Sequence, residues 1–403
     1  SYFYFFNFLQ MKKLYFLFFF TIGFFGNAQI VNIPDANFKA RLLAATSNNT
    51  IAKNLSGNYF RIDANYDGNI QISEALQVSL LNVYSCQISS LEGIQSFTNL
   101  KELNCYLNEL TSLNVQGLTN LQNLNCYSNQ ISNINVQGLL NLQELNCFEN
   151  QISTLDVQGL INLKHLNCNI NQISTLDLHN LINIENLDCS SNQLTSLNIE
   201  GCNNLQIFTC SNNLLNSLDL SSFTNITTIS CSSNQFVSIN IKNGKLENWI
   251  NFSNNSNLMY MCCDEEQIDY MQYLVSQYGM LNCSINSYCS FTPGGTFYEI
   301  SGTTKFDSNS NGCDGSDINY SNLHFSVTDG TNTGSLIANQ TGNYYIPVSA
   351  GNHTITPFLE NPSYFNVLPT IFSVDFPTQI SPFNQDFCVT ANGVHSDVEI
   401  VLV

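Results

Sequence analysis

Residues 100–115 read LKELNCYLNELTSLNV, and this stretch sets the frame to which much of the chain aligns. A leucine lies two residues before Cys105, and an asparagine lies three residues after it. The frame recurs every 21 residues at seven cysteines, which are Cys105, Cys126, Cys147, Cys168, Cys189, Cys210 and Cys231. It extends to Val83 and to Phe252, so we count nine coils. A fixed period of this length predicts a solenoid whose units bury their apolar edges against one another.

The residue pattern within a coil predicts two extended segments. The triplet Leu-x-Cys alternates inward and outward side chains, which is typical of one strand in a parallel sheet. A second triplet, residues 113–115 in the first full coil, predicts that the convex side is short strand rather than helix. The recurring asparagines, from Asn108 to Asn255, are expected to bond the backbone of the adjacent coil. The cysteines are interpreted as small apolar core residues, because sulfur atoms in a row do not converge on a metal.

The outward residues of the first sheet form the candidate ligand-binding surface on the concave face. Tyrosine and phenylalanine recur in one column there, flanked by glutamate, asparagine and histidine. An exposed aromatic strip of this kind favours a peptide or a sugar ring as ligand, although stacked aromatics also stabilise a sheet without binding anything. The candidate residues are Glu102, Asn104, Tyr106, Asn125, Tyr127, Glu144, Asn146, Phe148 and His165.

The composition excludes some partners. The chain of 403 residues has a formal net charge of −19, and charged residues make up 10% of it. Too few cations are present to neutralise phosphates, so nucleic acid and anionic membrane surfaces are not expected partners. The chain also lacks the sequence patterns of hydrolase nucleophiles and metal-binding helices, so we predict that it is not an enzyme. The sequence does not indicate an oligomeric state.

The amino-terminal region predicts export and a calcium site. Residues 11–28 resemble a secretory signal that is cleaved before Gln29, and no later segment is apolar enough to span a bilayer. A helix expected at about 33–45 covers the end of the solenoid, and a short helix is expected at 73–78. Between them, residues 63–74 match a 12-position calcium loop. Its expected ligands are Asp63, Asn65, Asp67, Asn69 and Glu74.

The coils at residues 81–258 resemble the leucine-rich repeat, L-x-x-L-x-C-x-x-N-x-L. More closely, the chain resembles exported bacterial, internalin-like leucine-rich-repeat proteins of the Bacteroidetes type, in which a leader like residues 33–75 precedes the first coil. The resemblance implies a binding or adhesion protein of the cell surface or the secreted fraction. Related proteins carry further modules and a carboxyl-terminal sorting domain, so we expect this chain to be part of a longer protein.

The carboxyl-terminal region predicts a cap followed by an all-β domain. A helix is expected from Asp264 to Gly279, and four cysteines surround it, with a pairing that the sequence leaves open: Cys262, Cys263, Cys283 and Cys289. From about residue 290, alternating runs at 296–301, 323–327, 343–347, 353–357, 371–376 and 398–403 favour a β-sandwich. Cys313 and Cys388 are the only cysteines of this domain, so we expect them to form a disulfide.

The β domain also contains a second candidate calcium loop. Its segments resemble the prealbumin-like B repeats of bacterial surface adhesins, and this resemblance implies calcium bound by a D-x-N-x-N-G loop. The corresponding residues are Asp307, Asn309 and Asn311, with Asp317 as the best further acidic partner. The glutamate that often ends such a loop is missing here.

These observations predict an α/β solenoid with a strand-rich convex side, followed by an all-β sandwich. The expected domains are the upstream residues with the signal peptide at 1–28, a helical cap with the calcium loop at 29–80, leucine-rich repeats at 81–258, a cap helix at 259–289 and the sandwich at 290–403. The expected function is recognition of a protein or glycan, with calcium as a structural cofactor. The alternative is a surface stalk without a specific ligand.

Overall fold

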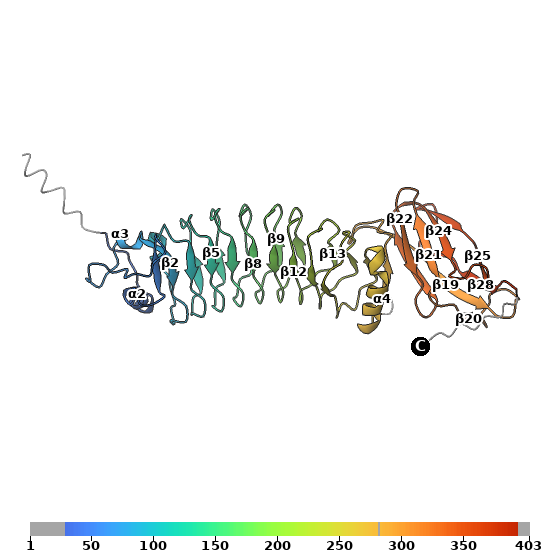
Figure 1. Ribbon diagram of the computed structural model, residues 1–403, viewed down its shortest axis with the longest axis horizontal. Helices are drawn as coiled ribbons and strands as arrows, with labels where there is room; N and C mark the ends of the chain where they lie inside the picture. The colour runs from blue at the N-terminus through green and yellow to red at the C-terminus, as the bar shows by residue number, and fades with distance from the viewer. Residues whose placement is uncertain (1–28, 281–282, 394–403) are drawn as a thin grey trace, which may run out of the picture. The chain divides into compact units, whose positions relative to one another are not determined.

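The computed structural model describes residues 29–280 and 283–393 and divides the chain into two compact units, Ser1–Glu144 and Leu145–Val403. Each unit is described by itself, with the element labels of Figure 1. The expected signal peptide and the expected strand at 398–403 lie outside the described residues.

The first unit begins with a small cap and continues into the coils. Its helices are α2 (Ala36–Leu43), α3 (Ile72–Ala75) and the short 3-10 helix η1 (Ile94–Ser96). Its strands are β1 (Ala52–Asn54), β2 (Val78–Asn82), β3 (Glu102–Asn104), β4 (Ser112–Asn114), β5 (Asn123–Asn125) and β6 (Asn133–Asn135). Strand β7 (Glu144–Asn146) starts at the last residue of this unit.

The cap differs in two ways from the sequence prediction. Helix α3 ends at Ala75, and Val78, which we expected in this helix, instead begins strand β2. Strand β2 pairs in parallel with β3, and the unpredicted strand β1 pairs antiparallel with the other edge of β2. Pairing with two neighbours satisfies the backbone of residues 78–82, which outweighs a weak local helix signal. Strand β1 also covers the sheet edge, which would otherwise be open to another chain.

Helix α2 is attached to the first coil through its N-cap, Asp35. One carboxylate oxygen accepts the backbone N–H of Phe38 at 2.9 Å. The other accepts the backbone N–H groups of Ser89 and Ser90 at 2.8 and 3.0 Å. Partial burial opposes ionisation of this carboxyl group, but the hydrogen bonds outweigh it and lower the pKa of Asp35. The cap is therefore held to the coil by a charged group.

The second unit continues the coils with strands of three residues. They are β8 (His165–Asn167), β9 (Thr175–Asp177), β10 (Asn186–Asp188), β11 (Ser196–Asn198), β12 (Ile207–Thr209), β13 (Ser217–Asp219), β14 (Thr228–Ser230), β15 (Ser238–Asn240) and β16 (Trp249–Asn251).

The coils of both units contain the same two sets of parallel strands. We call the parallel sheet of the Leu-x-Cys triplets the front sheet; it runs β2-β3-β5 in the first unit and β8-β10-β12-β14-β16 in the second. Residues 21 apart are paired along it, for example Leu187 with Phe208 and Phe208 with Ile229. The second triplets form the back strands, such as the pairs β4-β6 and β9-β11. The structure thus confirms a repeat solenoid built of two sets of strands, but not its α/β class, because the described coils at 81–258 contain no helix except η1.

The asparagine column joins successive coils as expected. The amide nitrogen of Asn213 donates to the carbonyl oxygens of Cys189 and Cys210, both at 3.0 Å, and its amide oxygen accepts the N–H of Leu194 at 2.9 Å. The pattern repeats at Asn129 and Asn171. Each asparagine follows a residue with a left-handed backbone, such as Ile170 with a φ of 50°, which is unusual for a β-branched side chain. The stacked amides therefore impose a turn that the local sequence does not favour.

At the carboxyl-terminal end of the coils, the pairing of back strands continues past residue 258. The back strands β13 and β15 continue into β17 (Tyr260–Cys262) and β18 (Ser284–Asn286). Between β17 and β18 lie the short 3-10 helix η2 (Glu265–Gln267) and α4 (Ile268–Gln277), close to the predicted cap helix. A disulfide joins Cys262 to Cys289, which resolves the open pairing. Strand β18 then pairs antiparallel with β22, so one sheet passes from the coils into the strand-rich region.

The strand-rich region consists of two sheets around one apolar core. Its strands are β19 (Tyr298–Asp307), β20 (Ile318–Asn319), β21 (His324–Thr328), β22 (Thr333–Ile337), β23 (Asn343–Val348), β24 (Gly351–Phe358), β25 (Phe365–Leu368), β26 (Phe372–Phe376), β27 (Phe383–Asn384) and β28 (Phe387–Ala391). Strands β22-β21-β24-β26 belong to one sheet, and β20-β19-β28-β25 to the other. The core takes Phe325 and Ile355 from the first sheet and Ile300 and Val389 from the second.

Candidate functional site

The candidate binding surface of the first unit is centred on a stack of three tyrosines. Tyr84, Tyr106 and Tyr127 each lie two residues after the end of a front-sheet strand, and the residue before each of them is buried. The ring centroids of Tyr84 and Tyr106 are 4.6 Å apart, and those of Tyr106 and Tyr127 are 4.5 Å apart. The interplanar angles are 2° and 8°. Parallel strands in register place equal positions about 4.8 Å apart, so the sheet itself holds these rings face to face.

The face-to-face stacking determines which parts of the rings a ligand can reach. Both faces of Tyr106 are covered by neighbouring rings, so its edge and hydroxyl group remain for contact. Partial desolvation, together with the nearby phenols of Tyr127 and Tyr84, raises the pKa of Tyr106. Its hydroxyl group is therefore protonated at neutral pH and can donate a hydrogen bond.

Carboxylates and amides lie beside the tyrosine stack. Asn104 donates from its amide nitrogen to Glu102 Oε1 at 2.7 Å, and Asn123 donates to Glu144 Oε2 at 2.8 Å. No other hydrogen bond to Glu102 or Glu144 is present in the described part of the chain, which leaves one oxygen of each carboxylate for a ligand. The amide oxygen of Asn125 is screened from solvent and accepts no hydrogen bond within the same residues.

The structure thus brings six of the nine predicted ligand residues together in the first unit. These are Glu102, Asn104, Tyr106, Asn125, Tyr127 and Glu144. The other three, Asn146, Phe148 and His165, belong to the second unit. There Phe148 is half-buried, and His165 begins strand β8 and pairs in register with Asn186.

Sequence reasoning missed two aromatic residues on the front sheet. Tyr84 belongs to the first coil, which lacks the marker cysteine, and it extends the stack by one ring. Trp249 belongs to the last coil, 21 residues after Thr228, and its side chain is 49% exposed. The frame already reaches both coils through Val83 and Phe252; Tyr84 lies 22 residues before Tyr106, and Trp249 lies 21 residues after Thr228.

In the first candidate calcium loop, side-chain oxygens accept backbone N–H groups of the same loop. The backbone N–H of Asp67 lies 3.2 Å from Asp63 Oδ1 and 3.1 Å from Asn65 Oδ1, so these two oxygens are close together. Glu74 turns back over the loop, with Oε1 accepting the N–H of Ala64 at 2.8 Å. Asn69 instead accepts from the side chain of Lys39 at 3.1 Å, which leaves its backbone carbonyl as the possible ligand. The oxygen-only donor set suits calcium.

The second candidate loop repeats this turn in the strand-rich region. Asp307 Oδ1 and Asn309 Oδ1 accept the N–H of Asn311 at 3.2 and 3.0 Å, and Asp307 Oδ2 accepts that of Gly312 at 2.9 Å. Asp317 accepts the N–H of Asp314 at 2.8 Å. Within the described residues of both loops, no three His, Cys, Asp or Glu side chains are close enough to hold a metal by themselves. Any calcium site would therefore also depend on amide and carbonyl oxygens.

The strand-rich region also contains the predicted cysteine pair. Cys313, at the second loop, forms a disulfide with Cys388 of β28, and 75 residues separate the two in sequence. Through this bond, the loop is attached to the sheet that contains β19 and β28.

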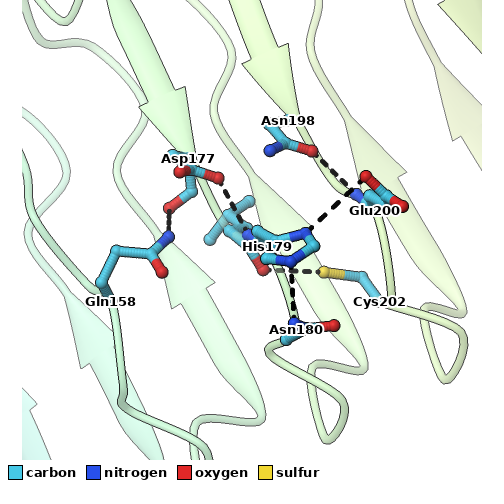
Figure 2. A network of polar contacts seen from close by, with 8 residues as sticks. Gln158, Asp177, His179, Asn180, Asn198, Glu200 and Cys202 are labelled. Atoms are coloured by element: carbon cyan, nitrogen blue, oxygen red, sulfur yellow. Dashed lines mark hydrogen bonds and ion pairs between the residues drawn. The ribbon is translucent and has the colours of Figure 1, made fainter.

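A histidine and a glutamate approach each other on the back strands of the second unit (Figure 2). His179 Nδ1 lies 3.8 Å from Glu200 Oε2, and Asp177 Oδ1 accepts the backbone N–H of His179 at 3.0 Å (Figure 2). The same turn recurs one coil later, where Asn198 accepts the N–H of Glu200 at 3.1 Å. Cys202 lies nearby, but burial raises its pKa to about 11, so its thiol is protonated at neutral pH. The repeat geometry explains this network without a catalytic role.

Comparisons with known proteins find similar solved structures only. No family model matches the chain, and no curated protein matches it. Among solved structures, the functional domain of InlJ from Listeria monocytogenes, described as including a cysteine ladder, is 24% identical with a TM-score of 0.40; the match covers 59% of this chain and 57% of that one. The chain therefore spans little more than half of the InlJ domain.

Other matching structures are also repeat proteins. Internalin InlF from Listeria monocytogenes is 18% identical with a TM-score of 0.36, and the match covers 65% of this chain and 92% of that one. The leucine-rich effector YopM from Yersinia pestis is 18% identical with a TM-score of 0.34, covering 41% and 60%. These scores are too low to carry an argument, so the description of the coils as leucine-rich repeats rests on their strand pairing.

Proposed function

We propose that this chain is an exported binding protein whose first unit recognises a protein partner through the front sheet. The stack of Tyr84, Tyr106 and Tyr127 is the observation that supports this function most. Sugar rings usually pack on an open aromatic face, and both faces of the central ring are covered. The exposed ring edges and hydroxyl groups suit the hydrogen-bonding groups of a polypeptide.

The charge beside the stack indicates the chemistry of the partner. Glu102 and Glu144 each keep one carboxylate oxygen without a hydrogen bond in the described residues. A protein segment with lysine or arginine would pair with these oxygens, whereas an acidic segment would be repelled. We therefore favour a basic protein surface as the partner.

The two disulfides support a role outside the cell, because disulfides persist in oxidising compartments. Separately, no helix in the described ranges is both long and apolar enough to cross a bilayer. The strand-rich region is, in this proposal, a β-sandwich that serves as a spacer, and calcium reinforces the loops at Asp63 and Asp307.

The function is tested by attachment of the purified chain, residues 29–403, to cell or matrix surfaces. Replacing Tyr106 and Tyr127 by alanine removes most of the stack and should weaken attachment about tenfold or more, as expected for the anchors of an interface. Pretreating the surface with a protease should abolish attachment, whereas pretreating it with glycosidases should not.

A matched control removes two tyrosines elsewhere. Tyr270 and Tyr273 of helix α4 are 51% and 57% exposed, and their replacement by alanine should leave attachment unchanged. If the Tyr106→Ala, Tyr127→Ala variant attaches as well as the unmodified chain, the stack is structural and the alternative of a surface stalk is favoured.

A further inference from the structure

The last strand of the front sheet carries an aromatic side chain that the tyrosine stack does not include. Trp249 is the single tryptophan of the chain, and it begins β16, which ends the front sheet of the second unit. Its side chain is 49% exposed, although Ile250 and Phe252 beside it are buried. No ring of a described residue stacks on the indole, so no aromatic neighbour competes with a ligand for its faces.

Polar groups without partners surround this indole. Thr228 pairs in register with Trp249 on the adjacent strand, and Asn251 lies two residues further along the same face. Asn251 uses its amide oxygen to accept the N–H of Ser253 at 3.0 Å. Among the described residues, no hydrogen bond reaches the indole N–H of Trp249, the hydroxyl group of Thr228 or the amide nitrogen of Asn251. Hydrogen-bonding capacity is therefore available next to a half-exposed indole.

The front-sheet residues beside Trp249 are uncharged. The outward residues of the last three front-sheet strands carry hydroxyl, amide or apolar side chains: Ile207, Thr209, Thr228, Ser230, Trp249 and Asn251. On the next strand, both oxygens of Asp188 accept hydrogen bonds, from Ser190 and from Asn169. In the loop before β16, both carboxylate oxygens of Glu247 accept hydrogen bonds, from Asn243 and from Gln267, and Lys245 is exposed.

We propose that Trp249, Thr228 and Asn251 form a binding subsite for a neutral carbohydrate. The apolar face of a pyranose ring packs on the indole, and its hydroxyl groups exchange hydrogen bonds with the threonine hydroxyl and the asparagine amide. The front-sheet residues here provide no charge to pair with a charged ligand, whose desolvation would then be costly, so a neutral ligand suits this surface better. This subsite lies in the second unit and does not depend on the protein-binding surface proposed for the first.

The single tryptophan is a built-in reporter of this subsite. The purified chain, residues 29–403, is titrated with neutral hexasaccharides of glucose, mannose, xylose and N-acetylglucosamine, while indole emission and its quenching by acrylamide are recorded. At least one sugar should give a saturable blue shift and protect the indole from acrylamide. If none does so up to its solubility limit, the proposal is wrong.

Variants that keep Trp249 test its neighbours. Thr228→Ala and Asn251→Ala should each weaken the affinity for the responding sugar about fivefold, because each removes a hydrogen bond worth about 1 kcal/mol. Affinities equal to that of the unmodified chain in both variants would overturn the assignment of these residues. Trp249→Ala should abolish binding measured by calorimetry, with an unchanged circular dichroism spectrum as the control for folding.

The titration also separates this proposal from the proposed function. The Tyr106→Ala, Tyr127→Ala variant should respond to the sugar as the unmodified chain does. Loss of the sugar response in that variant would overturn the independence of the subsite. The indole emission could also respond to a protein from the cell or matrix surface and to none of the sugars. That result would assign Trp249 to a protein interface instead.

Discussion

At the scale of single residues, amide side chains connect the coils in two different ways. The buried column, which includes Asn213, makes hydrogen bonds to the backbone of its own coil and of the preceding one. A second column, which we did not predict, lies at the surface; there Asn204 donates to the carbonyl oxygen of Ile182 at 2.9 Å. Asn183 and Asn225 repeat this second contact one coil before and after.

The two columns should differ in energy. Asn213 is 5% exposed, so Asn213→Ala leaves buried carbonyl and N–H groups without partners and should lower the free energy of unfolding by about 2–3 kcal/mol. Asn204 is exposed, and water replaces its bond, so Asn204→Ala should cost less than about 1 kcal/mol. Urea unfolding measures both. Equal losses of unfolding free energy in the two variants would contradict the idea that burial makes the Asn213 contacts more stabilising.

At the scale of elements, the ends of the solenoid are completed by segments that do not follow the repeat. Strand β1 covers the first edge of the front sheet, and β18 connects the back strands with β22. Glu265 of helix η2 accepts hydrogen bonds from the hydroxyl groups of Ser287 and Ser335. This contact joins the cap to the strand-rich region within the second unit.

The two candidate calcium loops belong to this scale, because the first leads into helix α3 and the second follows strand β19. Adding calcium should raise the unfolding temperature by several degrees, since a ligand at 100 times its Kd stabilises the folded state by about 2.7 kcal/mol. Asp67→Asn keeps an oxygen that can accept the N–H of Asn69 and should lose the part of the shift due to the first loop. Asp307→Asn is the matched variant for the second. Identical unfolding in calcium and in a chelator would contradict both sites.

At the scale of the whole molecule, the reactivity of the cysteine thiols shows whether the coils are stacked. Among the described free cysteines, all except Cys86 and Cys283 are buried. Burial raises the pKa of Cys105, Cys147 and Cys231 to about 12. At pH 8, roughly one such thiol in ten thousand is ionised, so these cysteines should be inert while the coils remain stacked.

A thiol reagent should therefore label the folded protein first at Cys86, which is half-exposed. Cys283 should react slowly, because packed side chains around its sulfur raise its pKa although part of the residue is accessible. Cys86→Ser should remove the fast phase, and denaturant should release the remaining thiols, as read by mass spectrometry. Fast labelling of Cys189 or Cys210 in the folded state would contradict a closed core.

Much of the solenoid could be predicted because its residues act through a fixed spacing. Cys105 and Cys126 mark equal positions, so the register of their strands follows from the count between them. The candidate site was only partly predictable. Tyr106 and Tyr127 were found as neighbours, but the covering of their ring faces depends on side-chain orientation. Trp249 was missed because it matches the position of Thr228 in its coil, outside the column of Tyr106 and Tyr127.

The amino-acid sequence by itself determined the coil length, the parallel register and the inward leucines, cysteines and asparagines, since each coil repeats the same contacts with the next. Only the tertiary structure decided what happens where the repetition stops. It placed β1 against β2, extended the back strands to β18, joined Cys262 to Cys289 and left Trp249 exposed on the last strand. The physical reason is that a terminal coil has a neighbour on one side alone, so the segments that happen to reach its open edge determine its pairing and exposure.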